Sequence, residues 1–171
     1  MFKLRRKSQC SIFGSTQSYV GVYFSYLAKM EDLPERLGSI ELFFAHGKQC
    51  HRFRVGSDTL LEIDEISELQ SDHEEADTRI LLHAKHASHD YDHVVIQSPD
   101  TDVFVLLVGH KCSFDASLNF ETGSGNKCRM IDINKIQEEL GSDFSSALLG
   151  FHSFTGITIQ DTSFFNCDNY N

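Results

Sequence analysis

Two acidic segments lie about one helix apart in this 171-residue chain, and together they constrain its fold and its chemistry. The first, residues 72–77, opens a helical pattern, and the second, residues 98–102, ends a short apolar strand. Crowded carboxylates repel one another unless positive charge compensates them. Carboxylate oxygens also suit hard cations such as Mg²⁺ or Mn²⁺. The two segments therefore predict a metal site built from a strand end and a helix start.

The order of the predicted elements is that of a layered α/β fold. Apolar spacing predicts a helix from residue 72 to about residue 87. The next run, residues 93–97, shows little alternation, which is typical of a strand buried on both faces. A helix, a buried strand, an acidic strand end and further helices predict a three-layer α/β/α sandwich with a mainly parallel sheet. In such sheets sites form beyond the carboxyl ends of the strands, where Asp100 and Asp102 fall.

Other segments carry weaker local signals. Residues 102–109 are apolar enough for either a strand or a short helix. The remaining predicted elements are a helix at 18–30, strands at 40–45 and 50–55, an ambiguous segment at 60–66, a hairpin of 118–122 with 127–131, and helices at 132–140 and 142–154. We therefore expect an unassigned N-terminal segment of a helix and a hairpin at 1–65, one α/β domain at 66–160 and a frayed tail at 161–171.

Charge and cysteine content bound the chemistry further. The net charge is −10, so the chain lacks the broad basic surface that is typical of nucleic-acid-binding proteins. Carboxylates that bind metal ions would add negative charge that the ions later offset. The five cysteines are scattered and form no CxxC motif, which favours reduced thiols in an intracellular protein of the nucleus or cytoplasm. No stretch approaches transmembrane length, and we expect no membrane contact.

Asp100 and Asp102 admit two interpretations. Pro99 holds the residue before it extended, and alternation in an extended segment would place both carboxylates on one side, where they can bridge metal ions. The other interpretation is a turn in which Asp100 or Asp102 caps a following helix. The sequence leaves both open.

The acidic residues at the start of the 72–87 helix are equally ambiguous. Glu74, Glu75 and Asp77 lie in the first turn, where the helix dipole stabilises carboxylates regardless of function. Glu74 and Asp77 share a helix face because they are three residues apart. Glu75 joins Asp77 only if Glu75 lies in an irregular first turn.

Four histidines follow on the same helix and just after it, at positions 83, 86, 89 and 93. His83 and His86 have a spacing that can chelate zinc on a helix. No cysteine lies near them in sequence, and the spacing drifts around the helix. A solvated polar face is therefore the favoured interpretation, and a zinc site is the distant one.

Several motifs, in order along the chain, resemble those of one nuclease family. They are Glu75-Ala76-Asp77, Ser98-Pro99-Asp100-Thr101-Asp102, residues 133–141, and Phe154-Thr155-Gly156. They resemble the flap-endonuclease-like branch of the PIN-like nuclease superfamily, which carries Glu-Ala-Glu at a helix start and Glu-Asp-x-Asp after a buried strand. Residues 73–79 and 150–156 look closer still to a group of largely uncharacterised, transposon-associated animal proteins. The match covers about residues 71–156.

The resemblance implies a PIN-like three-layer fold and Mg²⁺- or Mn²⁺-dependent hydrolysis of phosphodiester bonds in DNA or RNA. Matched position by position, it assigns Asp100 and Asp102 a catalytic role. The implied metal ligands are Glu75, Asp77, Asp100 and Asp102, with Glu74 and Asp161 as weaker candidates.

Two departures from the family pattern support a competing class. The family's Gly-x-Asp reads Gly156-Ile157-Thr158 here, and Asp161-Thr162-Ser163 resembles the missing segment displaced by three residues. The family's early aspartates have no equivalent before residue 71, so we expect an incomplete domain that is truncated at its N-terminus. The alternative function is a catalytically inactive PIN-like remnant that acts as a binding or structural module.

Overall fold

The structure, a computed structural model, describes residues 2–5, 9–13, 20–71 and 76–154. Its strands are β1 (Phe2–Arg5), β2 (Gln9–Phe13), β3 (Leu42–His46), β4 (Gln49–Val55), β5 (Leu61–Glu65), β6 (His93–Gln97), β7 (Ser117–Thr122) and β8 (Arg129–Asp132). Its α-helices are α1 (Val20–Ala28), α2 (Leu33–Leu37), α3 (Ala76–Asp90), α4 (Thr101–Gly109), α5 (Ile133–Leu140) and α6 (Ser142–Phe154).

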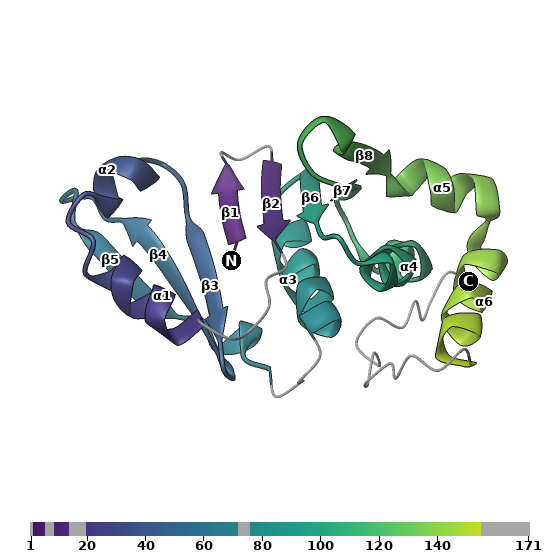
Figure 1. Ribbon diagram of the computed structural model, residues 1–171, viewed down its shortest axis with the longest axis horizontal. Helices are drawn as coiled ribbons and strands as arrows, with labels where there is room; N and C mark the ends of the chain where they lie inside the picture. Colours follow the sequence, from purple (N-terminus) through teal and green to yellow (C-terminus); the bar gives the residue numbers. More distant parts are fainter. Residues whose placement is uncertain (1, 6–8, 14–19, 72–75, 155–171) are drawn as a thin grey trace.

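The strands form two groups of three joined by a central hairpin, in the order β5-β4-β3-β1-β2-β6-β7-β8 (Figure 1). The β3-β4-β5 group is antiparallel throughout. In the other group β6 pairs with β7 in parallel, and β7 pairs with β8 antiparallel. The hairpin of β1 and β2 lies between the groups, with β1 antiparallel to β3 and β2 parallel to β6.

The prediction of a three-layer α/β/α sandwich with a mainly parallel, PIN-like sheet is therefore wrong. Among the described strands only the β2–β6 and β6–β7 pairings are parallel. The buried run at 93–97 does lie between two parallel neighbours, as its lack of alternation indicates. The error came from extending that local pattern to the whole sheet. Short turns join β3 to β4 and β4 to β5, and such connections allow only antiparallel pairing.

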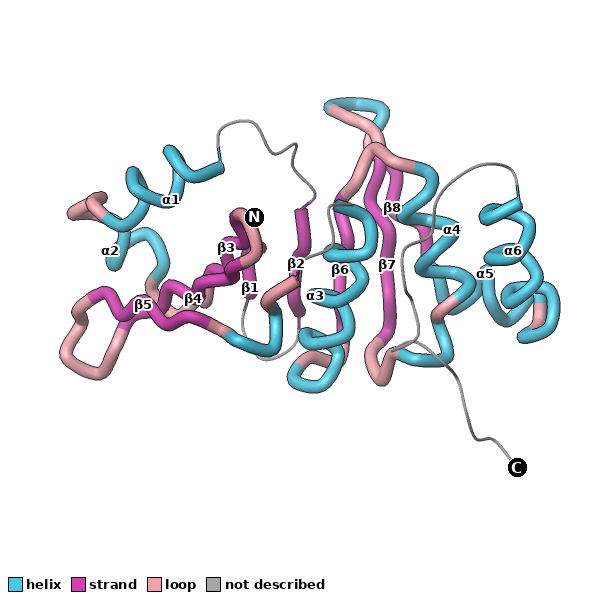
Figure 2. Tube along the Cα trace, turned by 90° about the horizontal axis from the view of Figure 1, so that it is seen from below, coloured by secondary structure: helices cyan, strands magenta, loops and turns pink. Residues whose placement is uncertain are grey.

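Two apolar clusters hold the fold together. The larger lies where α3 and α4 pack on the β2-β6-β7 region and includes Leu81, Ile96 and Leu107, all fully buried. The smaller lies between α1, α2 and the β3-β4-β5 group and includes Leu37 and Phe53. Each fully buried side chain of this size contributes about 2 kcal/mol through removal from water. Figure 2 shows α1 and α2 gathered at the β5 end of the sheet and α4, α5 and α6 at the β8 end.

Most local predictions on the C-terminal half are confirmed. The strand at 93–97, the β7–β8 hairpin and the helices at 132–140 and 142–154 are all present. Asp132 caps α5 by accepting from the backbone N–H groups of Asn134 and Lys135. Gly141 ends the helix with a φ of 77°, a left-handed conformation that favours glycine.

The ambiguous run at 102–109 is a helix, α4. Its start is fixed by Asp100, whose side chain accepts a hydrogen bond from the N–H of Asp102. Val103, Leu106 and Leu107 are buried, because α4 packs against α3 on one side and α5 and α6 on another. A helix enclosed in this way is apolar nearly all round, which is why its periodicity could not be read.

None of the described helices is long and apolar enough to span a membrane. The thiols of Cys50 and Cys128 are free, whereas Cys112 is disulfide-bonded. The prediction of reduced cysteines is thus wrong at Cys112.

Candidate metal centre

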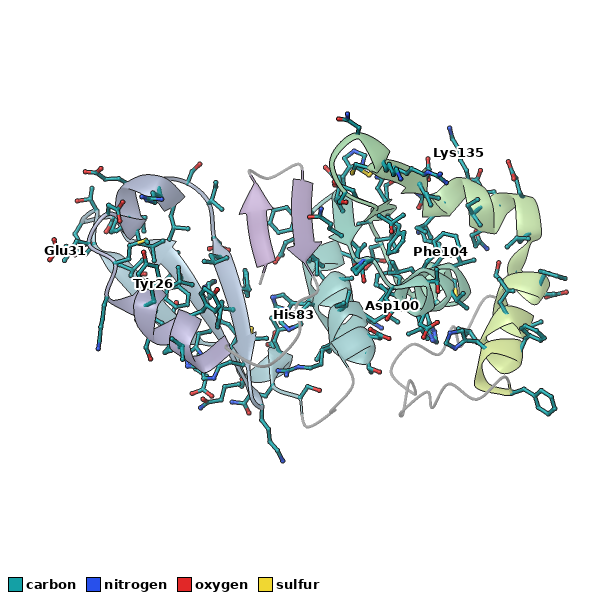
Figure 3. All side chains as sticks on the ribbon, in the orientation of Figure 1. Tyr26, Glu31, His83, Asp100, Phe104 and Lys135 are labelled. Atoms are coloured by element: carbon teal, nitrogen blue, oxygen red, sulfur yellow. The ribbon has the colours of Figure 1, made fainter. Side chains whose placement is uncertain are left out.

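Three aspartates from the starts of two helices converge on one point. Single carboxylate oxygens of Asp77, Asp100 and Asp102 all lie within 4.8 Å of one another. Asp77 is in the first turn of α3, Asp100 is the N-cap of α4, and Asp102 is in the first turn of α4. The centre therefore lies where two helices begin, just beyond the carboxyl end of β6. Figure 3 shows Asp100 between α3 and α4.

The loop between β6 and α4 is fixed by hydrogen bonds. The buried Ser98 donates its backbone N–H to the carbonyl of Glu121 on β7, at 3.1 Å. The Oγ of Ser98 accepts the N–H of Asp100 at 3.1 Å, and the Oδ1 of Asp100 accepts the N–H of Asp102 at 3.0 Å. These bonds hold the Asp100 carboxylate at the head of α4.

The capping interpretation of this motif is confirmed, whereas metal binding stays a prediction. Asp100 is a helix cap, as the structural interpretation requires, and it also lies within the aspartate cluster. The two aspartates do not face one way through strand alternation, because Asp102 is helical. Cap geometry brings them together instead.

A buried histidine holds the third aspartate. The Nε2 atom of His152, on α6, lies 3.1 Å from Oδ1 of Asp102. The side chain of His152 is only 7% exposed, and that of Asp102 is 29% exposed. Sequence reasoning did not single out His152. The only sequence signal for His152 was that it lies in residues 150–156, one of the segments that carry the resemblance. A contact between two helices this far apart in the chain produces no periodic pattern in the sequence.

The electrostatics of the cluster suit a divalent cation. Three carboxylates this close repel one another, and the partial positive charge at the first turns of α3 and α4 offsets only part of that repulsion. Asp100 is exposed, whereas Asp77 and Asp102 are half-buried. Mg²⁺ in proteins is commonly held by one or two carboxylates and keeps several waters. This cluster could supply such ligands and leave coordination positions open to solvent.

The other acidic residues named from the sequence cannot be placed. Glu74, Glu75, Asp161 and the Gly156-Ile157-Thr158 segment lie outside the described residues. Among the described residues, the three aspartates are the one group of three or more His, Cys, Asp or Glu side chains close enough to hold a metal ion.

The histidines of α3 do not form one solvated face. His83 is 3% exposed, so the prediction of a solvated polar face is wrong there. Burial, together with the neighbouring Arg79, lowers the pKa of His83 well below its ordinary value. His86 lies 3.7 Å from the carboxylate of Glu68, and His89 lies 3.9 Å from that of Asp115. No zinc-type cluster of these histidines is present among the described residues.

We compared the chain with protein-family models, with curated proteins and with solved structures, and none of the three comparisons finds a match.

Proposed function

We propose that Asp77, Asp100 and Asp102 bind a divalent cation, Mg²⁺ or Mn²⁺, and that the site hydrolyses phosphodiester bonds in DNA or RNA. The observation that carries the proposal is the approach of the three carboxylates to within 4.8 Å of one another. A divalent ion bound at such a site can activate a water molecule and stabilise a leaving oxygen.

The protein's own residues supply the positioning. The N–H of Asp102 fixes the orientation of the Asp100 carboxylate, and His152 fixes that of the Asp102 carboxylate. Asp100 and Asp102 each have a second oxygen, Oδ2, besides the Oδ1 atom that makes the contact just described. Ligands held in place by such contacts lose less freedom on binding an ion.

The substrate class rests on the resemblance of residues 98–102 to nuclease motifs, together with the exposed position of Asp100. A bound cation would also offset part of the chain's net charge of −10, which otherwise repels a nucleic acid.

A non-catalytic binding or structural module is the second candidate. One observation favours it, namely that both aspartates already have structural roles. Asp100 caps α4 through the N–H of Asp102, and Asp102 contacts the buried His152. In that case the cluster would follow from the way α4 begins and would have no catalytic role.

Titration of Mn²⁺ by calorimetry tests the proposal, using the wild type and the double variant Asp100→Asn/Asp102→Asn. Asparagine keeps the Oδ1 acceptor that the Asp102 N–H and His152 use, so the local fold is retained. Glu138→Gln/Glu139→Gln is the matched control, because it removes two exposed carboxylates on α5.

We expect roughly micromolar binding in the wild type and the control, and none in the aspartate variant. Mn²⁺-dependent cleavage of labelled single- and double-stranded oligonucleotides, lost in the same variant, would support the enzyme. Mn²⁺ binding without cleavage would point to the second candidate. Absence of binding in the wild type would overturn the metal site and would leave a structural module whose aspartates serve as helix caps.

A further inference from the structure

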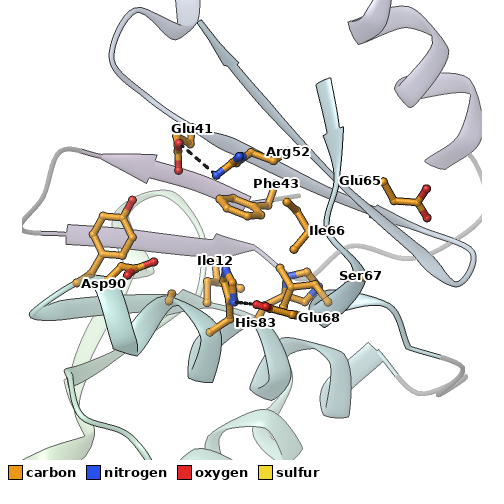
Figure 4. A pocket seen from close by; sticks show the side chains of 14 residues that line it. Ile12, Glu41, Phe43, Arg52, Glu65, Ile66, Ser67, Glu68, His83 and Asp90 are labelled. Carbon is orange, nitrogen blue, oxygen red and sulfur yellow. Dashed lines mark ion pairs between the residues drawn. The ribbon is translucent and has the colours of Figure 1, made fainter. Parts of the chain in front are cut away.

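We propose that the cavity between α3 and the β3–β4 face of the sheet is a binding site for a small organic cation, independent of the aspartate cluster. The cavity has a volume of about 320 Å³. That volume lies at the lower end of the range for ligand pockets in proteins. The short helix η2 (Ser67–Leu69) forms part of its lining. Figure 4 shows Glu41 and Arg52 on one side of the cavity and Glu68 and Asp90 on another.

The charge of the lining selects the sign of the ligand. Four acidic residues line the cavity, but the carboxylate of Glu65 is directed away from it, toward Gln49 and Gln70 (Figure 4). The carboxylates of Glu41, Glu68 and Asp90 therefore stand against one guanidinium, that of Arg52. The Nη2 of Arg52 lies 2.9 Å from the carboxylate of Asp64, and its Nη1 lies 3.8 Å from that of Glu41. An anion would therefore have to compete with two carboxylates for the one positive group. A cation faces a surplus of negative charge.

The buried histidine does not change this balance. His83 lines the cavity and is 3% exposed. Because burial lowers the pKa of His83 well below its ordinary value, its ring is neutral near pH 7. His86 lies against the carboxylate of Glu68. A positive charge on the His86 ring would therefore be offset by the negative charge of Glu68.

The apolar part of the lining selects the kind of cation. Phe43 and Tyr91 contribute aromatic rings, and Ile12, Leu69 and Ala87 contribute aliphatic surface. The ring of Phe43 is held edge-to-face with that of His86, with centroids 5.8 Å apart. An aromatic face attracts a cation, and the attraction is larger where water is excluded. An ammonium ion with a hydrocarbon body can use both the rings and the carboxylates.

A bare metal ion is the poorer fit. Among the described residues, the aspartate cluster is the one group of three or more His, Cys, Asp or Glu side chains close enough to hold a metal ion. In the cavity the carboxylates are spread over η2, α3 and the segment before β3. Separated carboxylates around an apolar surface suit an organic cation better than a metal ion.

Three probes of one shape and different charge test this site: benzylammonium, benzyl alcohol and benzoate. Each is titrated into the full chain, with backbone amide resonances followed by NMR near neutral pH. We expect benzylammonium to shift the resonances of Phe43 and Ala87 and to bind at least about tenfold more tightly than benzyl alcohol. Benzoate should leave those resonances unmoved. Equal binding of all three probes, or shifts confined to other regions, would overturn the proposal.

Charge variants provide the second arm. Glu68→Gln and Asp90→Asn each remove one exposed carboxylate of the cavity without touching the core. Glu138→Gln removes one exposed carboxylate on α5 and serves as the matched control. We expect weaker benzylammonium binding in the first two variants and unchanged binding in the control. An equal loss of affinity in all three variants would mean that the net charge of the protein alone attracts the probe. That result would contradict a specific binding site in the cavity.

Discussion

His152 and Asp102, on helices far apart in the sequence, meet through a hydrogen bond of 3.1 Å between Nε2 and Oδ1. The imidazole is almost fully buried, whereas the carboxylate is partly open to solvent. The bond therefore links the interior of α6 to the exposed cluster at the start of α4. Through this bond a change in α6 would act on the aspartate cluster.

We predict that His152→Ala lowers the free energy of unfolding by about 2 kcal/mol, because it removes a hydrogen bond to an acidic group and buried contacts. In an Asp102→Ala background the same change should cost less, since the partner is already absent. A double-mutant cycle by urea denaturation measures the difference, for which we expect a coupling of about 1 kcal/mol. Equal losses in both backgrounds would mean that the bond contributes nothing to stability.

At Asp100 two substitutions separate capping from charge repulsion. Asp100→Ala removes the acceptor for the N–H of Asp102 and should destabilise the protein by about 1 kcal/mol. Asp100→Asn keeps an acceptor and removes one of three crowded charges, so in metal-free buffer it should be neutral or slightly stabilising. Thermal and urea unfolding in the presence of a chelator measure both. A loss with asparagine as large as with alanine would show that the negative charge itself is needed for the cap.

Burial of His83 should make the protein less stable in mild acid. Its pKa is lowered from 6.5 in the folded state, so the unfolded chain takes up a proton first as the pH falls below 6.5. The free energy of unfolding should then drop by up to about 1.4 kcal/mol per pH unit until the folded form is protonated as well. His83→Gln should flatten this slope in urea titrations between about pH 7.5 and about pH 5.5.

The matched control for that change is His89→Gln on the same helix, where the side chain is 59% exposed. The control should keep the wild-type slope. If His83→Gln also keeps it, the acid sensitivity comes from other groups, such as His46, whose pKa is lowered chiefly by burial.

Two glycines test the packing of α4 against α6. A Cβ added at Gly109 would collide with the side chain of Leu149, so Gly109→Ala should destabilise the protein by about 1–3 kcal/mol. Gly150 lies on α6 with nothing near the position of an added Cβ, and Gly150→Ala should be neutral or stabilising by up to about 1 kcal/mol. Thermal unfolding of the two variants gives the comparison. Equal shifts in melting temperature would contradict the close approach of the two helices.

Elements with local signals were predictable from the sequence. Asp132 and Gly141 marked the ends of α5, and the apolar run at 93–97 marked β6. The segments of β1 and β2 were not predicted as strands, because their order depends on distant partners at β3 and β6. Missing them removed the centre of the sheet and led to the wrong topology.

In the candidate site, too, some residues were predictable from the sequence and others were not. The three described aspartates could be named from sequence because each stands at the start of a predicted helix or the end of a predicted strand. His152 could not, since only the folding of α6 over α4 brings it to Asp102. The cavity beside α3 was also invisible, because its lining comes from five separate segments.

The central hairpin has a consequence for how the chain assembles. Phe2 pairs with Phe43, and Cys10 pairs with Val94, so these early strands find their neighbours only after much of the chain is available. Closing such long loops is entropically costly and slows folding. Until β1 and β2 insert, β3 and β6 present bare edges that can pair with another chain. The pairings of β1 with β3 and of β2 with β6 therefore cover two edges that would otherwise favour aggregation.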